Sequence, residues 1–344
     1  MLLVLWIVAG RPRLPATTSL QIDDLFGGIK IALAVVAGIG GVVALVVAYR
    51  RQRLGESAET REQSKMMIER FGAAAAQLGA DSPAVRMAGG YAMAGLADDW
   101  EPQRQRCIDI LCGYIRMPHS PTAPDNPLDF AAWQRERAVR LTALRLIASH
   151  LRDDVEQSWR NYDLDFTGAV IDEADFRGVR FTGGEIIFIN AIFVGHGRDQ
   201  VIFDDVEFAS GTHVYFRLAE FRSGSIRFDR CAFTGGWVTF DSARFTGADV
   251  TFREAAFLGG EVRFEDAEFA AGSVDFTGAS FTGGIVDFRE SHLKTRYVTV
   301  KSARFTGGKV IISQVSDLTR PPQFGLKEKP PGLELPAGID ISDL

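Results

Sequence analysis

Phenylalanine recurs along the second half of this 344-residue chain at alternating intervals of five and seven residues. Of its 25 phenylalanines, 21 lie between Phe166 and Phe305. The regular ladder comprises Phe216, Phe221, Phe228, Phe233, Phe240, Phe245, Phe252, Phe257, Phe264, Phe269, Phe276, Phe281 and Phe288, and it continues through Leu293, Val300, Phe305 and Ile312. Such a short fixed period predicts a solenoid, because each repeat can bury its apolar face only against its neighbours.

Paired glycines reveal a longer period of 24 residues within this ladder. The pairs are Gly235 and Gly236, Gly259 and Gly260, Gly283 and Gly284, and Gly307 and Gly308. The turns between them have other sequences, which predicts a 24-residue coil with four corners and a glycine column at one of them. Glycine there indicates either a positive φ or the close approach of another backbone. Small or β-branched residues such as Val214 and Val238 lie two positions before the phenylalanines, so the alternation of extended chain places them inside as well.

Several five-residue units resemble those of the bacterial pentapeptide-repeat proteins, which have a small residue two positions before a central Leu or Phe. Matching units are Ala174-Asp175-Phe176-Arg177-Gly178, Ala243-Arg244-Phe245-Thr246-Gly247, Ala279-Ser280-Phe281-Thr282-Gly283 and Ala303-Arg304-Phe305-Thr306-Gly307. The resemblance implies a right-handed quadrilateral β-helix over residues 161–316, with about six coils. The chain departs from the family pattern in its five- and seven-residue steps, which favour a wider or rectangular coil.

An uncharged apolar stretch near the N-terminus predicts a transmembrane helix over residues 29–49. Residues 31–49 contain no charge, and as a helix they nearly match a hydrocarbon core of about 30 Å. Arg50, Arg51 and Arg53 follow at once, which places the C-terminal side in the cytoplasm. Residues 1–28 are expected to form an apolar N-terminal segment and an external loop, and whether residues 1–10 belong to a second span is left open. Small residues four apart, such as Ala34 and Gly38, suit a homodimer of this helix.

Residues 50–160 are predicted to form a helical stalk and cap. Apolar residues recur there at three- and four-residue spacing, and Pro83, Pro102 and Pro127 stand where helices are expected to begin. A cap would cover the phenylalanines and strand edges of the first coil. The same region would also suit a partner-binding domain. The proline-rich residues 317–344 are expected to form a partly extended C-terminal tail.

A search for chemistry-bearing motifs predicts no catalytic, cofactor-binding or metal-binding residues. The five histidines lack paired ligand spacing, and no Walker, Gly-x-Ser-x-Gly or Cys-x-x-Cys pattern occurs. The three cysteines, Cys107, Cys112 and Cys231, are expected to be buried thiols of a reducing compartment. A polar insertion at residues 195–200 interrupts the repeat and is the one loop where a site would be sought.

These features predict a non-enzymatic scaffold in the cell membrane, whose cytoplasmic β-helix presents a rigid surface for protein–protein interaction. The expected partners are the lipid bilayer, an unidentified cytoplasmic or membrane protein and a second copy of the chain, without nucleic acid. The alternative is a DNA mimic that regulates or protects a topoisomerase. A mimic needs a continuous acidic stripe, and the candidate residues Asp241, Glu265, Asp266 and Glu290 are bounded by Arg217 and Arg289.

Overall fold

The computed structural model describes residues 22–152, 156–195, 201–293, 297–315 and 328–336. The chain divides into two compact units, Met1–Met66 and Met67–Leu344, and each is described by itself. The described part of the first unit belongs to helix α2 (Ile22–Leu78), whose last turns lie in the second unit. Over Phe26–Leu54 this helix is long and apolar enough to cross a membrane, and it is not buried. A signal sequence near the N-terminus would have the same length and composition.

A small helical region precedes the solenoid in the second unit, as predicted. After the end of α2 it contains α3 (Pro83–Asp99), the 3₁₀ turn η1 (Glu101–Gln103), α4 (Arg104–Arg116) and α5 (Pro127–Ser149). Pro83 and Pro127 occupy the first positions of α3 and α5, where the missing N–H costs no helical hydrogen bond. The Asn126 side chain accepts a hydrogen bond from the Leu128 amide at 2.9 Å and so caps α5. Pro102 lies in η1 and precedes α4.

The solenoid consists of four parallel sheets, which form its four sides. The first sheet contains β1 (Leu164–Asp165), β5 (Glu185–Ile187), β9 (His213–Tyr215), β13 (Trp237–Thr239), β17 (Glu261–Arg263), β21 (Ile285–Asp287), β25 (Lys309–Ile311) and β26 (Leu333–Glu334). The second contains β2 (Val170–Ile171), β6 (Ile192–Val194), β10 (Glu220–Ser223), β14 (Arg244–Phe245), β18 (Glu268–Phe269) and β22 (His292–Leu293). The third contains β3 (Ala174–Asp175), β7 (Val201–Ile202), β11 (Ser225–Arg227), β15 (Asp249–Thr251), β19 (Ser273–Asp275) and β23 (Tyr297–Thr299). The fourth contains β4 (Arg180–Phe181), β8 (Glu207–Phe208), β12 (Ala232–Phe233), β16 (Ala256–Phe257), β20 (Ser280–Phe281) and β24 (Arg304–Phe305).

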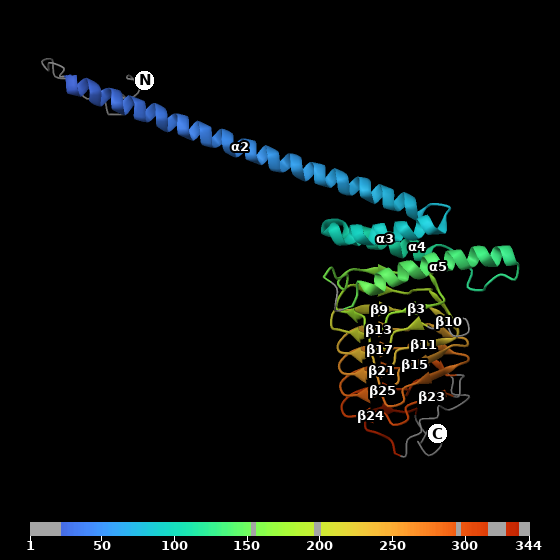
Figure 1. The fold of residues 1–344 in the computed structure, drawn as a ribbon. Coiled ribbons are helices and arrows are strands. Elements are labelled where there is room, and N and C mark those ends of the chain that lie inside the picture. Colours follow the sequence, from blue (N-terminus) through green and yellow to red (C-terminus); the bar gives the residue numbers. More distant parts are fainter. Residues whose placement is uncertain (1–21, 153–155, 196–200, 294–296, 316–327, 337–344) are drawn as a thin grey trace. The chain divides into compact units, whose positions relative to one another are not determined.

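From β9 to β25 successive coils stack in the 24-residue register that the sequence predicts (Figure 1). The two earlier intervals in the first sheet are 22 and 28 residues, because Leu164 pairs with Ile186 and Ile186 pairs with Val214. In the first sheet, Val214 pairs with Val238, and the same column continues through Val262, Val286 and Val310. About six turns are formed, because each of the other three sheets contributes one strand to each coil and has six strands. The tail contributes β26, which pairs with β25 and extends the first sheet by one strand.

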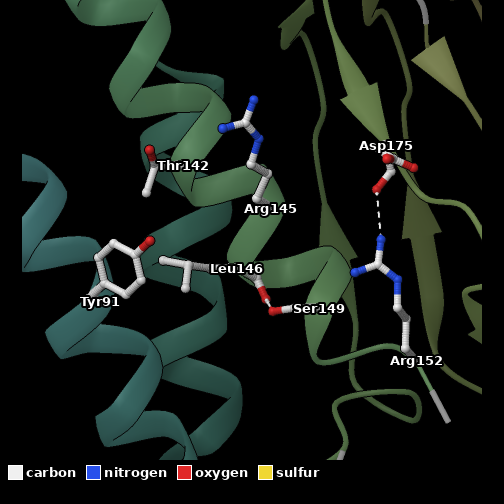
Figure 2. Close-up of a pocket in the computed structure, with 7 residues that line it drawn as sticks. All are labelled: Tyr91, Thr142, Arg145, Leu146, Ser149, Arg152 and Asp175. Atoms are coloured by element: carbon white, nitrogen blue, oxygen red, sulfur yellow. Dashed lines mark hydrogen bonds between the residues drawn. The ribbon is translucent and has the colours of Figure 1, made fainter. Parts of the chain in front are cut away.

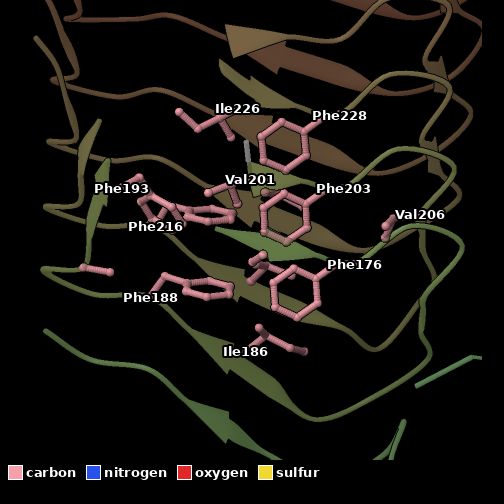
Figure 3. Packing of buried hydrophobic residues seen from close by; sticks show 14 of the residues in the cluster. Phe176, Ile186, Phe188, Phe193, Val201, Phe203, Val206, Phe216, Ile226 and Phe228 are labelled. Carbon is pink, nitrogen blue, oxygen red and sulfur yellow. The ribbon is translucent and has the colours of Figure 1, made fainter. Parts of the chain in front are cut away.

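The phenylalanine ladder fills the interior of the coils (Figure 3). Every ladder residue from Phe216 to Phe288 is at most 1% exposed. Equivalent rings of neighbouring coils stack face to face: the centroids of Phe216 and Phe240 lie 4.6 Å apart, and those of Phe240 and Phe264 lie 4.7 Å apart. Rings from adjacent sides meet edge-on or tilted, as Phe252 and Phe264 do at 6.3 Å. Both arrangements suit the quadrupole of the aromatic ring.

The glycine pairs occupy a corner where successive backbones approach closely. A Cβ atom at Gly260 would lie 2.6 Å from the Gly236 carbonyl oxygen, and one at Gly308 would lie 2.7 Å from the Gly284 oxygen. None of the paired glycines has a positive φ. Of the two reasons considered for this column, close approach therefore applies.

Positive φ occurs instead at a series of residues that mostly carry side chains. The non-glycine members, with φ between 55° and 59°, are Asn190, Asp205, Leu218, Arg230, Ser242, Glu254, Asp266, Glu290 and Ser302. Each of these residues lies two positions after an inward-facing residue of the ladder or of its looser continuation toward the N-terminus. Their amides continue the bonding between coils, since the Ser242 amide donates to the Glu265 carbonyl at 2.8 Å. The series marks two left-handed corners, one after the strands of the first sheet and one after those of the third, where the chain turns sharply and a side chain points outward.

The helical region caps the first coil by hydrogen bonding at or beside all four of its strands. Gln105 Nε2 donates to the Asp163 carbonyl at 2.9 Å beside β1, and Arg140 Nη2 donates to the Val170 carbonyl at 3.2 Å in β2. Arg152 Nη2 lies 3.5 Å from the Asp175 carbonyl in β3, and the Arg180 amide of β4 donates to the Leu151 carbonyl at 3.1 Å. These contacts cover a strand edge that would otherwise be open to another chain.

Candidate functional site

A groove of about 770 Å³ runs along the outward face of the first sheet. The valine column of this sheet points inward, so the residues that flank each valine point outward. Tyr215, Trp237, Thr239 and Arg263 reach the groove in this way from β9, β13 and β17. The register pairs Thr239 with Tyr215 on one side and with Arg263 on the other. We call this depression the first-sheet groove.

The four carboxylates considered for a DNA mimic all line the first-sheet groove. Asp241, Glu265, Asp266 and Glu290 lie within it, together with Arg217. Asp266 and Glu290 belong to the left-handed corner that follows the first sheet, and Ser242, one coil before Asp266, donates its hydroxyl to the Asp266 carboxylate at 3.2 Å. Arg289, the other expected boundary, does not line the groove. Its Nε instead donates to Asp287 at 2.7 Å.

Arg263 crosses this acidic set and removes its continuity. Its Nε donates to Asp241 Oδ1 at 2.9 Å, a second nitrogen contacts the same carboxylate, and Nε lies 3.5 Å from Glu265. The guanidinium lies 5.0 Å from the centre of the Trp237 ring, within cation–π range. Its pKa is raised, chiefly by the hydrogen bond to Asp241. The groove is therefore of mixed charge and partly aromatic.

Sequence reasoning identified the carboxylates but missed Tyr215, Trp237 and Arg263 as members of the same surface. The signal was available in the alternation of the strands, because each of these residues stands one position from an inward valine. What the alternation does not give is the direction of a long side chain. The contact of Arg263 with Trp237 and Asp241 depends on its rotamer.

The outward column Glu220, Arg244, Glu268 and His292 is also in register on the second sheet. Arg244 lies 3.5 Å from Glu268, and His292 lies 3.6 Å from Asp266 of the adjoining corner. Such exposed pairs contribute only about 0–1 kcal/mol each. This column therefore contributes charged groups to the surface and adds little to the stability of the fold.

Asp98, His150 and Ser149 have the composition of a hydrolytic triad but not its geometry. His150 Nδ1 lies 2.6 Å from the Leu146 carbonyl, so this nitrogen carries a proton and cannot accept one from Ser149. The Ser149 hydroxyl donates to the same carbonyl at 2.8 Å. Asp98 accepts from the indole of buried Trp159 at 3.0 Å, and the His150 ring stacks on that indole at 4.0 Å. The cluster joins α3, α5 and the segment that leads into the first coil.

Other chemistry-bearing groups of the described residues do not converge. No three His, Cys, Asp or Glu side chains in those residues are placed to hold a metal ion. The three cysteines are buried, and burial raises the pKa of each thiol. Of the polar insertion at residues 195–200, residues 196–200 lie outside the described part of the chain.

Comparison with known proteins finds no matching family model, no matching curated protein and no matching solved structure.

Proposed function

We propose that this protein is a membrane-tethered, non-enzymatic scaffold whose solenoid, of the pentapeptide-repeat type, binds a protein partner in the cytoplasm. The observation that carries this proposal is the first-sheet groove, which lies on a rigid, regularly stacked support. The residues that form the groove are held by their strands and corners, so they need little ordering when a partner binds.

The composition of the groove supports a protein partner. Tyr, Trp and Arg are enriched among the residues that dominate binding energy at protein interfaces. Tyr215, Trp237 and Arg217 offer these side chains, and the surrounding carboxylates offer a polar rim. The four carboxylates that line the groove favour the DNA-mimic alternative, but Arg263 disfavours it because this arginine neutralises Asp241 in the middle of the set.

The apolar helix supports the membrane part of the proposal. The span Phe26–Leu54 has the required length, and Arg50, Arg51 and Arg53 lie near its C-terminal end. A homodimer through Ala34 and Gly38 is compatible with this helix. Fusing a reporter after Leu344 tests the orientation: we expect activity only from a reporter that functions in the cytoplasm, and periplasmic activity would refute the proposed localisation.

Site-specific cross-linking tests the interaction surface. Tyr215 is replaced by p-benzoylphenylalanine in the full-length chain, and cross-links are formed in intact membranes. The matched control places the same residue at Leu258, which is 48% exposed and follows β16 of the fourth sheet. We expect one discrete adduct from position 215 only, lost when Asp266 and Glu290 are changed to lysine. The same adduct from both positions would exclude the groove as the binding surface.

A supercoiling assay separates the two candidate functions. The scaffold proposal expects the full-length protein neither to inhibit nor to protect gyrase, at low or at physiological salt. Inhibition that disappears when Asp241, Glu265, Asp266 and Glu290 become lysine, and that weakens with salt, would favour the DNA mimic.

A further inference from the structure

A second groove, of about 480 Å³, lies where α3 and α5 meet the first coil (Figure 2). Tyr91 of α3 and Leu146 of α5 supply its apolar wall, and Arg145 and Arg152 lie closer to β3. Its size falls within the range of small-molecule sites. No part of the proposed scaffold function uses it. We call it the cap groove.

The sequence of α5 places the polar residues of the cap groove on one side of the helix. Thr142, Arg145 and Ser149 are three and four residues apart, and such positions share a helical face. Arg152 follows the helix end at Ser149 and points toward β3, where its Nη2 lies 3.5 Å from the Asp175 carbonyl. The groove is thus built from a helix face and a strand edge within one compact unit.

The acidic side chains at the cap groove, of which Asp175 lines it, pair mainly with other arginines. Asp175 accepts two hydrogen bonds from Arg177, at 2.9 and 2.6 Å, and these hold its pKa below the usual value. Glu173 accepts from Arg137 at 3.1 Å, and Arg137 also donates to Asp172 at 2.5 Å, so the two carboxylates share this arginine. Arg145 forms a longer ion pair with Glu173, at 3.6 Å, which exceeds hydrogen-bond length.

Arg137, Arg145, Arg152 and Arg177 therefore face three carboxylates, Asp172, Glu173 and Asp175, which leaves an excess of one positive charge around the cap groove. Arg152 donates Nε to the carbonyl of Arg177 at 3.1 Å, and carbonyls do not neutralise its charge. The Arg145 side chain is 68% exposed. Each guanidinium has five N–H donors, so both retain donors for a ligand.

We propose that the cap groove binds a phosphate monoester carried on an apolar or aromatic group. Two guanidinium groups attract an anionic phosphate, and their planar forks match its oxygens. Tyr91 is 61% exposed, and with Leu146 it forms a wall for the apolar part of the ligand. A lipid headgroup and a soluble phosphate ester share this chemistry. The proposal does not depend on the scaffold function.

The test measures ligand-induced stabilisation of the full-length protein. In neutral detergent, phenyl phosphate is titrated while the unfolding midpoint is followed, because a ligand of the folded state raises it. In parallel, the protein is placed in phosphatidylcholine nanodiscs with and without about one tenth phosphatidic acid, a fraction chosen to leave the bilayer mainly neutral. A shift with phenyl phosphate identifies a soluble ester, and a shift only with phosphatidic acid identifies a lipid headgroup.

Variants assign the effect to the groove. Arg145→Gln and Arg152→Gln should each weaken binding about tenfold or more, since a charge-assisted hydrogen bond is lost. The matched control is Arg135→Gln, an exposed arginine of α5 that does not line the groove, and it should bind normally. Arg145→Gln keeps the test valid if Arg152→Gln fails to fold, because the Arg145 side chain is largely exposed.

Three results would overturn the proposal. The first is no stabilisation by either phosphate probe, and the second is binding that survives Arg145→Gln unchanged. The third is equal affinity for benzoate, which would show that the groove does not select phosphate.

Discussion

Phe264 provides the sharpest test of the stacked core. Its side chain is fully buried, and its ring stacks on Phe240 and on Phe288, each at a centroid distance of 4.7 Å. Phe305 belongs to the ladder as well but is only partly buried, and among the described residues its ring stacks on one neighbour, Phe281, at 4.7 Å. Replacing each by alanine therefore compares a ring sandwiched between two coils with one stacked on a single side.

The expected losses follow from burial and stacking. A buried Phe→Ala change costs about 3–5 kcal/mol, of which each lost aromatic pair contributes roughly 0.5–1.5 kcal/mol. Phe264→Ala should lie at the upper part of this range, because neighbouring coils hold the cavity open on both sides. Phe305→Ala should cost about half as much, since one stacking partner is missing and part of the ring is already in contact with water.

Urea denaturation of the full-length protein in detergent, followed by circular dichroism and by tryptophan fluorescence, measures both losses. Comparing the two probes also shows whether the helical region and the solenoid unfold together, since repeat arrays can lose cooperativity. Equal losses for Phe264→Ala and Phe305→Ala would refute the reasoning, and so would a loss below about 1 kcal/mol at Phe264, because that is less than its stacking contribution alone.

Three further predictions test the corners and the buried thiols. Gly260→Ala should destabilise the protein in the same urea assay, because the new Cβ would lie 2.6 Å from a backbone carbonyl, whereas Gly113→Ala meets nothing within 4 Å and should be neutral or stabilising by up to about 1 kcal/mol. Leu218→Gly should raise the free energy of unfolding by about 1 kcal/mol, because Leu218 has a φ of 58°. Leu258→Gly, at a similarly exposed position without positive φ, should lower it, and the opposite order would disprove backbone strain at Leu218. Burial raises the pKa of Cys107 to about 11, so only about a thousandth of this thiol is ionised at pH 8 and its alkylation should be slow. The alkylation rate should increase as the pH approaches that pKa and should become fast when the protein unfolds. Rapid alkylation of the folded protein at pH 8 would contradict the burial of Cys107.

Much of the solenoid could be predicted because its core is a one-dimensional pattern. The spacing of the phenylalanines gives the coil length, and the valines two positions earlier give the inward face of the first sheet. Helix starts were predictable for a similar reason, since proline at the first turn is a local signal, as Pro83 and Pro127 show. In each case the information lies within one repeat or one turn.

Features that depend on contact between coils were harder to predict. Glycine at the Gly-Gly corner had two explanations, and only the 2.6 Å approach to Gly236 at Gly260 distinguishes them. Six of the nine non-glycine positions of positive φ carry Leu, Arg, Ser or Glu, residues whose local preference is against this conformation; only Asn190, Asp205 and Asp266 are of types that adopt it more readily. Arg263 was likewise identifiable as outward, but its contacts with Trp237 and Asp241 are tertiary.

The left-handed corner that follows the first sheet connects this unexpected backbone to the candidate function. A non-glycine residue in this conformation costs roughly 1–2 kcal/mol, and the cost recurs in successive coils. It is offset there by hydrogen bonds between coils, such as those from the Leu218 and Ser242 amides to the next coil at 3.0 and 2.8 Å. Glycine at these positions would remove the strain, but it would also remove the side chain. The non-glycine residues therefore keep outward-pointing groups at the sharp turns. Asp266 and Glu290 are two of them, and both line the first-sheet groove. The same stacking that tolerates the strain therefore fixes the carboxylates at the rim of the proposed binding surface.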